Sequence, residues 1–248
     1  MDLNQIKFNY SPGEYGKNRT TPVQWIDYHV LAWEKRRLEK KTKTAGSEKI
    51  PLTICFSRKI GVGALEIADL LGKKMGYRVA DRKIIETIAG DANISKKTAA
   101  VYDEKYPGKM ADFLRLLFGE KAFIKSDYTR HLFSTVLSIA GLEPTIFVGR
   151  GAHLILPRDR VLAVRFICSK DHRVRRLAAI FGVEKEVAKM KLDQIDREQK
   201  AFFKNTFGKK DASPYEFDVV VNCDHITSSQ WSAEIVAQAF KQKFGNHI

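Results

Sequence analysis

The chain has 248 residues, of which 44% are hydrophobic and 10% aromatic, a composition that excludes an intrinsically disordered chain and predicts one large globular domain, or one domain with an appendage. Its 43 lysines and arginines outnumber its 29 aspartates and glutamates, so the net charge of +14 predicts a surface that attracts phosphates, nucleic acid or anionic lipid. No apolar run reaches the roughly 18 residues of a membrane span, and the polar start Met1–Gln5 is not that of a signal peptide, so we expect a cytoplasmic protein without a membrane span.

Residues 1–50 are predicted to form an N-terminal arm, made of an amphipathic helix and a linker. Thr21 is a typical helix N-cap, and Pro22 is a typical first helical residue. Apolar residues then recur at helical spacing, at Val23, Ile26, Val30 and Trp33. Such a helix could pack on its own domain, on a second copy of the chain or on an anionic surface, and residues 42–50 would link it to the rest. A homodimer could therefore form through this helix, or through the helical stretch 83–140.

From Pro51 onward, short apolar runs alternate with amphipathic stretches. We expect strands at 52–56, 77–80, 145–148, 161–167 and 217–221, and helices at 64–75, 83–140, 170–210 and 228–244. Strands that alternate with helices predict an α/β fold, in which a parallel five-stranded sheet is flanked by helices.

A glycine turn follows the first predicted strand, at a place where α/β sheets bind ligands. The carboxyl ends of parallel strands open a crevice, and the loops 57–64, 81–82 and 149–151 all lie at such ends. Gly61 and Gly63 would let backbone N–H groups turn toward a phosphate, at the positive end of the following helix. The turn is therefore a candidate phosphate-binding loop.

The turn alone leaves three interpretations open. Aligned on Gly63, a standard phosphate-binding loop would have a lysine at Ala64 and a hydroxyl residue at Leu65. A dinucleotide-binding turn is favoured by Asp81, which lies about 20 residues after the glycines at a strand end, but it requires a third glycine where the chain has Glu66. The third interpretation is a tight turn between a strand and a helix that binds nothing.

Four segments, taken together and in this order, resemble the cytidylate kinase-like family, a branch of the P-loop nucleoside monophosphate kinases. The segments are 54–63 (ICFSRKIGVG), 81–85 (DRKII), 148–152 (VGRGA), and a fourth that joins 193–197 and 202–204 to 214–222. The resemblance implies a P-loop NTPase-like domain at residues 51–248 with a degenerate P-loop. Within that domain it implies a helical acceptor-binding insertion at about 82–142 and a basic helical lid at about 184–210.

The resemblance also implies an ATP-dependent phosphotransferase that moves a phosphoryl group from ATP to a nucleoside monophosphate such as (d)CMP. ATP and Mg²⁺ would be its cofactors and nucleotides its partners, while the metal ligands stay unknown. The residues expected to bind the donor nucleotide are Ser57, Gly61, Val62, Gly63 and Ala64. Those expected to bind the acceptor are Asp81, Arg82, Arg150 and Gly151. The expected catalytic cations are Arg58, Lys59 and Arg197, and the expected lid cations are Arg173, Arg176, Lys200 and Lys204.

Departures from the family's pattern favour a second interpretation, a non-catalytic nucleotide-binding regulatory protein. The loop lysine is missing, and Leu65 stands where the family often has arginine. Gly151 stands where the cytidylate kinases have an acidic residue that reads the base, so cytosine specificity is not predicted. A basic scaffold or nucleic-acid-binding protein that uses the arm 21–43, and a dinucleotide oxidoreductase, are further alternatives. The pair Lys209–Lys210 is too short to favour a nucleic-acid partner.

Several of these site residues also have structural interpretations. Asp81 precedes an apolar helix, as a helix N-cap does. Arg197 could pair with Asp193 one turn earlier on the same helix. The arginines at 173–176 could form a solvated helix face.

Overall fold

The computed structural model describes residues 24, 28, 50–91, 96, 99–100, 102–103, 106, 108, 112, 115 and 127–245. The predicted arm helix and linker lie almost wholly outside the described residues, and so does the middle of the predicted helical stretch 83–140. None of the helices that the structure describes is long and apolar enough to cross a membrane.

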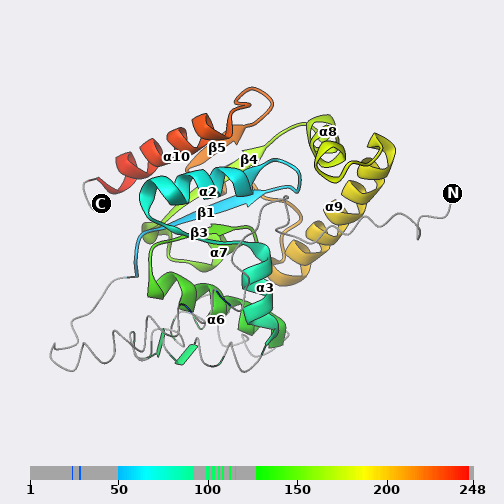
Figure 1. The fold of residues 1–248 in the computed structure, drawn as a ribbon. Coiled ribbons are helices and arrows are strands. Elements are labelled where there is room, and N and C mark those ends of the chain that lie inside the picture. Colours follow the sequence, from blue (N-terminus) through cyan, green and yellow to red (C-terminus); the bar gives the residue numbers. More distant parts are fainter. Residues whose placement is uncertain are drawn as a thin grey trace.

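Five strands form one sheet, which confirms the predicted fold class (Figure 1). They are β1 (Thr53–Arg58), β2 (Arg78–Ala80), β3 (Thr145–Val148), β4 (Val161–Ile167) and β5 (Val219–Asn222). Their order is β2-β3-β1-β4-β5, and every neighbouring pair is parallel. The predicted start of the last strand at 217 was wrong by two residues. Pro214–Glu216 form a 3₁₀ turn there, which Phe217 closes by donating its N–H to the Pro214 carbonyl.

Helices cover both faces of the sheet (Figure 1). One face packs against α2 (Ala64–Met75) and α10 (Ser229–Phe244), and its core includes Ile54 and Phe56 of β1. The opposite core includes Cys55, between those two residues, and packs against α3 (Arg82–Gly90), α6 (Asp127–Leu142) and the short α7 (Ala152–Ile155). Successive β1 side chains thus point to opposite faces, as the strand period of two requires.

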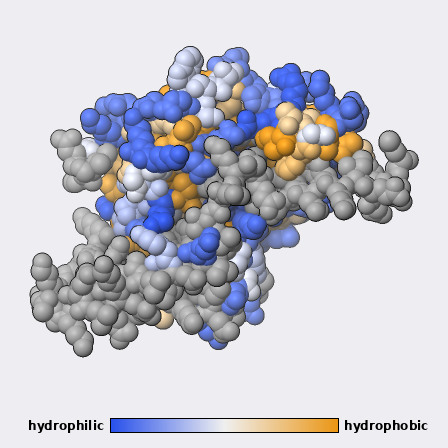
Figure 2. Space-filling view, viewed as in Figure 1, coloured by the Kyte–Doolittle hydropathy of each residue, from blue (hydrophilic) through white to orange (hydrophobic). Residues whose placement is uncertain are grey.

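The predicted helical stretch 170–210 is two helices, α8 (Lys170–Phe181) and α9 (Lys185–Phe207). Gly182 ends α8 in a left-handed conformation with a φ of 61°. A small apolar core joins the two helices to Ile60, in the loop after β1. This core places α9 beside the glycine turn. Among the coloured residues in Figure 2, polar side chains predominate, and apolar side chains gather near α8 and α9, with smaller apolar areas elsewhere.

The strand order creates a crevice at the carboxyl end of the sheet. β1 leads to α2 on one face, whereas its neighbour β3 leads to α7 on the other face. The two loops therefore diverge, and α/β proteins bind ligands at such a point. The loops that diverge here contain the glycine turn and the Gly149-Arg150-Gly151 sequence.

Candidate functional site

The glycine turn has the backbone of a loop that only glycine adopts without strain. Gly61 and Gly63 both have a φ of +88°, and Gly63 is the N-cap of α2 with no side-chain capping hydrogen bond. Because glycine has no side chain, Gly63 cannot cap the first N–H groups of α2. A phosphate bound at this turn would meet the positive end of the helix. Ala64 and Leu65 are buried in the apolar core and offer no cation or hydroxyl to a ligand.

Two arginines of α8 lie directly on this turn. A Cβ at Gly61 would lie 3.0 Å from the Cβ of Arg173, and a Cβ at Gly63 would lie 3.3 Å from the guanidinium carbon of Arg176. Arg176 pairs with Glu66 at 2.7 Å. Arg173 is only 4% exposed, so the interpretation of a solvated helix face is wrong for this residue.

Arg173 also ties the turn to α9. Its two Nη nitrogens each donate to the Asp196 carboxylate at 2.9 Å, and Nη1 lies 3.4 Å from the Ile60 carbonyl oxygen. Gln199 of α9 donates its amide to the Arg58 carbonyl at 2.8 Å. The predicted lid helix is therefore packed against the predicted phosphate loop.

The turn after β3 has three successive residues with left-handed backbones. The φ angles of Gly149, Arg150 and Gly151 are 97°, 52° and 70°. Such a conformation is costly for a residue with a Cβ, so a constraint must hold Arg150 there. A Cβ at Gly151 would lie 2.5 Å from the ring of Phe207, so close packing of the α9 end requires glycine at this position.

Arg150 is buried in a cationic cavity of about 260 Å³. Its guanidinium pairs with Glu86 and lies 4.0 Å from the centre of the Phe202 ring. Burial lowers the pKa of Arg150 to about 10, so the side chain keeps its charge at neutral pH. The same cavity is lined by the predicted site residues Arg58 and Arg82. Three of the expected phosphate-binding cations thus surround one cavity.

Asp81 has the structural role that its position indicated. Its Oδ1 accepts the N–H of Ile84 at 2.9 Å and caps α3. The N-cap interpretation is confirmed, while a role in acceptor binding stays a prediction. Arg82, the next residue, donates Nε to Glu86 at 3.0 Å.

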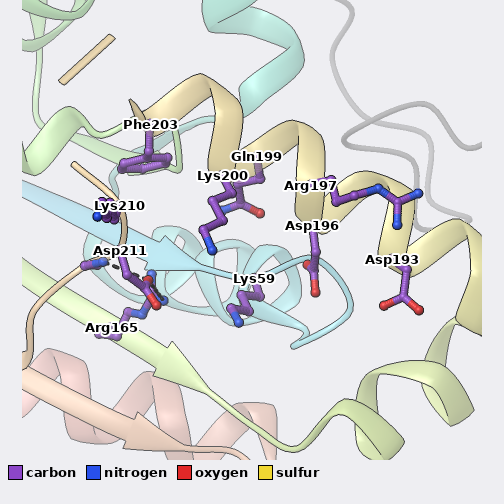
Figure 3. Close-up of a pocket in the computed structure, with 11 residues that line it drawn as sticks. Lys59, Arg165, Asp193, Asp196, Arg197, Gln199, Lys200, Phe203, Lys210 and Asp211 are labelled. Atoms are coloured by element: carbon purple, nitrogen blue, oxygen red, sulfur yellow. Dashed lines mark hydrogen bonds and ion pairs between the residues drawn. The ribbon is translucent and has the colours of Figure 1, made fainter. Parts of the chain in front are cut away.

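A second cationic cavity of about 280 Å³ lies between α9 and the loop after β1 (Figure 3). Lys59, Arg197 and Lys200 line it, whereas the exposed Lys204 does not. In Figure 3, Lys200 extends from α9 toward the loop that contains Lys59. Asp193, the predicted alternative partner of Arg197, forms its ion pair with Lys170 at 2.5 Å, and Arg197 interacts with it only electrostatically.

Arg165 of β4 lines this cavity and was missed in the sequence. It is opposite Ser57 in the sheet register, and its Nη1 donates to the Ser57 hydroxyl at 2.7 Å. Burial lowers the pKa of Arg165, and its nearest carboxylate in the cavity is Asp211, at 4.0 Å. A single arginine within the apolar run of β4 was the only available signal.

Buried donors around the two loops have no acceptor. The Nε atoms of Arg150, Arg173 and Arg176 are buried, and none has a hydrogen-bond partner among the residues that the structure describes. A buried donor without an acceptor costs about 1–3 kcal/mol, so such groups commonly mark a ligand site. Phosphate oxygens are acceptors of the kind that arginine binds best.

The site offers little to a metal ion. Over the described part of the chain, no group of three or more histidine, cysteine, aspartate or glutamate side chains is placed to hold one. Leu65 supplies no oxygen ligand, and Asp196 is occupied by Arg173.

Comparison with known proteins gives a family match and a shared fold. Residues 53–225 match the model of the cytidylate kinase-like family. An uncharacterized protein from Eubacterium ventriosum ATCC 27560 is 18% identical, with 78% of this chain and 99% of that chain covered and a TM-score of 0.60. Shikimate kinase from Bacteroides thetaiotaomicron is 14% identical over 77% of this chain and 96% of its own, with a TM-score of 0.38. TT1252 from Thermus thermophilus is 18% identical over 80% of this chain and 100% of its own, with a TM-score of 0.46. No curated protein matches the chain.

Proposed function

The chain belongs to the cytidylate kinase-like family, and on this premise we propose that it transfers a phosphoryl group from ATP to a nucleoside monophosphate such as (d)CMP. The observation that supports this most directly is the set of buried arginine Nε atoms without acceptors at both loops. Two such Nε atoms lie at the glycine turn and one at the Arg150 loop, where a donor and an acceptor phosphate would each need N–H donors.

The donor phosphates bind at the glycine turn. The uncapped start of α2 and the arginines Arg173 and Arg176 would supply N–H donors and positive charge to them. The acceptor phosphate binds in the Arg150 cavity, where a bidentate guanidinium suits phosphate geometry. Arg58 links the two sites, because its guanidinium lies 3.4 Å from where a Cβ of Gly149 would be.

Phosphoryl transfer requires that the protein position the two nucleotides and stabilise negative charge on the transferring group, and it requires little covalent chemistry from protein side chains. An oxygen of the acceptor phosphate attacks the γ-phosphorus of ATP, the bond to the β-phosphate oxygen breaks, and ADP leaves. Arg58, Lys59 and Arg197 would stabilise the charge on the transferring group. The packing of α9 on the loop would exclude water and limit hydrolysis. Mg²⁺, when bound with ATP, would neutralise phosphate charge.

A non-catalytic nucleotide-binding regulatory protein is the second candidate. Two observations favour it: Leu65 is buried in the core where a hydroxyl or cation would serve catalysis, and Asp196 already occupies Arg173. Such a protein would bind ATP at the glycine turn and produce no ADP with any acceptor.

Two further proposals concern the location of the protein and its partners. The protein acts in the cytoplasm on small nucleotides rather than on nucleic acid, and a homodimer, where one forms, uses the N-terminal helix or the helical insertion. Light scattering of the full chain and of variants on those two surfaces tests the dimer. Binding that falls steeply with salt and needs no free nucleotide would instead favour a nucleic-acid partner.

A thermal-shift panel with ATP, ADP and each nucleoside monophosphate, with and without Mg²⁺, tests the proposal. Ligands that bind the folded state raise the melting temperature. We expect shifts with ATP and with at least one monophosphate, and ADP formation when both are present. No shift with any nucleotide would contradict both candidates, and shifts without ADP formation would favour the regulatory protein.

The variant Arg150→Ala separates the two sites. It should abolish the shift with the monophosphate and keep the shift with ATP. Arg130→Ala is a matched control, because Arg130 is exposed on α6 and pairs with Asp127 on the same helix. The reverse pattern, loss of ATP binding alone, would overturn the assignment of the acceptor site.

A further inference from the structure

Glu86 joins two arginines of the Arg150 cavity that come from different elements. Its Oε2 accepts a hydrogen bond from the Nε of Arg82, one turn earlier on α3, at 3.0 Å. Its Oε1 pairs with the Nη2 of Arg150, in the turn after β3. All three side chains line the same cavity of about 260 Å³. Glu86 therefore links the first helix of the predicted insertion to the turn that contains Arg150.

Each arginine contacts Glu86 through one nitrogen and keeps other donors. The hydrogen bond from Arg82 uses Nε, so the two Nη nitrogens of this residue remain for other acceptors. The contact of Arg150 uses Nη2, and its buried Nε has no hydrogen-bond partner among the residues that the structure describes. Since both arginines line one cavity, their remaining donors can bind one anion with several oxygens, such as a phosphate.

Glu86 also offsets the repulsion between these two cations. Burial and the positive charge of Arg82 lower the pKa of Arg150. The negative charge of Glu86 has the opposite effect and favours the charged form of Arg150. Like charges repel more strongly in a partly buried cavity than in water. Without the carboxylate, the two guanidiniums would therefore favour conformations in which they lie farther apart.

The surroundings of Glu86 fix the place of its carboxylate. Asp81 caps the start of α3, and Ile85 and Ile88 of this helix are fully buried in the core. On the opposite side of the Arg150 guanidinium, the ring of Phe202 lies 4.0 Å from its carbon. A carboxylate on a helix that is anchored in this way can restrict two long side chains, which otherwise sample many rotamers.

We propose that Glu86 is a positioning residue of the acceptor site, whose carboxylate holds Arg82 and Arg150 so that their remaining nitrogens converge on one phosphate. This inference rests on the proposed function, because it requires that an acceptor phosphate binds in this cavity. A carboxylate repels a phosphate, so Glu86 acts through the two arginines and makes no contact with the ligand.

Two probes measure the acceptor site: CMP, and inorganic phosphate, which has neither base nor sugar. In calorimetric titrations of the full chain, Glu86→Gln should weaken the binding of both about tenfold, because it removes the charge that the two arginines share. Glu86→Asp keeps the charge but is shorter by one methylene group, so it cannot reach both arginines. It should weaken both probes by more than about threefold.

ATP binding and turnover distinguish positioning from a general loss of structure. The affinity of both Glu86 variants for ATP should stay within about twofold of the wild type. In turnover with ATP and CMP, Glu86→Gln should raise the KM for CMP about tenfold and change kcat less than about twofold. Weaker ATP binding that parallels the loss of CMP binding would contradict a positioning role.

Glu198→Gln is the matched control, because Glu198 lines the same cavity but accepts its hydrogen bond from Gln194 of its own helix, at 2.9 Å. The substitution removes the same charge from the same cavity and should weaken neither probe. Unchanged or tighter binding of both probes by Glu86→Gln would overturn the inference, and so would an equal loss with Glu198→Gln. If the unmodified chain binds neither probe, the proposed acceptor site fails and the inference fails with it. That result needs no variant, so the two failures are distinguishable.

Discussion

Arg173 of α8 and Asp196 of α9 form a two-pronged ion pair, with both Nη–Oδ distances at 2.9 Å. The Arg173 side chain is 5% exposed and the Asp196 side chain 24%. The pair holds the lid helix against the glycine turn, because Arg173 also contacts the Ile60 carbonyl. Its two hydrogen bonds occupy guanidinium nitrogens that a phosphate could otherwise contact.

Asp196→Ala should therefore destabilise the protein and strengthen its response to nucleotide. The variant leaves a buried guanidinium without its partner, at a cost of about 3 kcal/mol, the low end for buried pairs because Asp196 is partly exposed. ATP should then raise the melting temperature of the variant by more than that of the wild type. Urea unfolding and thermal shifts measure the two effects, with the exposed Asp159→Ala as control. An equal or smaller ATP shift in Asp196→Ala would show that no phosphate reaches Arg173.

Gly151→Ala should cost more stability than Gly182→Ala. Both glycines have left-handed backbones, which alone costs about 1 kcal/mol for alanine, and nothing lies within 4 Å of a Cβ at Gly182. At Gly151 the added Cβ would overlap the ring of Phe207. We expect an added loss of about 1–3 kcal/mol in urea unfolding, typical of overpacking. The double variant with Phe207→Ala should remove the added loss, and additive effects would contradict the steric explanation.

The stability of the protein should fall as the pH drops from about 6.5 to about 4. Burial lowers the pKa of His153 from 6.5 to about 4, although its contact with Glu216, at 3.3 Å, opposes that shift. Between these two pH values the unfolded chain binds a proton at His153 and the folded chain does not. The contribution of neutral His153 to the free energy of unfolding is therefore full above pH 6.5 and is lost as the pH falls toward 4. His153→Gln should flatten this part of the profile, by on the order of 2 kcal/mol in denaturant titrations. An unchanged slope would contradict a neutral buried His153.

Glu216 titrates in a separate range. Hydrogen bonds from Lys209 and His153 hold the pKa of this carboxyl below its ordinary value, against the opposing effect of burial. Its contribution is therefore lost only as the pH falls below about 4.5, an ordinary glutamate value.

Lys200→Ala should weaken ATP binding more than Lys73→Ala does. Both lysines are exposed, but Lys200 lines the cavity beside the glycine turn, whereas Lys73 lies in the last turn of α2 and does not line that cavity. Loss of one charge-assisted contact with phosphate should cost about fivefold to tenfold in affinity. Titration calorimetry at two salt concentrations checks this. Equal effects of the two substitutions would indicate that only the overall charge of the protein matters.

The sequence predicted the parts of the site that depend on local backbone. Gly61 and Gly63 indicated a glycine turn, and both have positive φ angles. The five strands followed from short apolar runs, since strands buried on both faces need such runs. Asp81 was predicted as a cap because capping depends on residues only three positions apart.

The parts that sequence could not give depend on distant partners. Arg173 and Asp196 are 23 residues apart, and Arg165 meets Ser57 across 108 residues, so neither pair leaves a local pattern. The break between α8 and α9 occurs at Gly182. A single glycine in the sequence does not indicate a break, because glycine also occurs within helices. In the structure, the two helices are separate and both pack on Ile60, a contact between distant residues.

Arg58 belongs to two loops at once. Its carbonyl accepts a hydrogen bond from the lid residue Gln199, and its guanidinium lies against Gly149 of the other turn. A ligand that draws the Arg58 guanidinium toward one loop changes the positive charge near the other loop. By linkage, the factor by which ATP alters affinity for the acceptor must equal the factor by which the acceptor alters affinity for ATP. The two substrates should therefore bind cooperatively, and Arg58→Met should reduce that cooperativity in both directions equally.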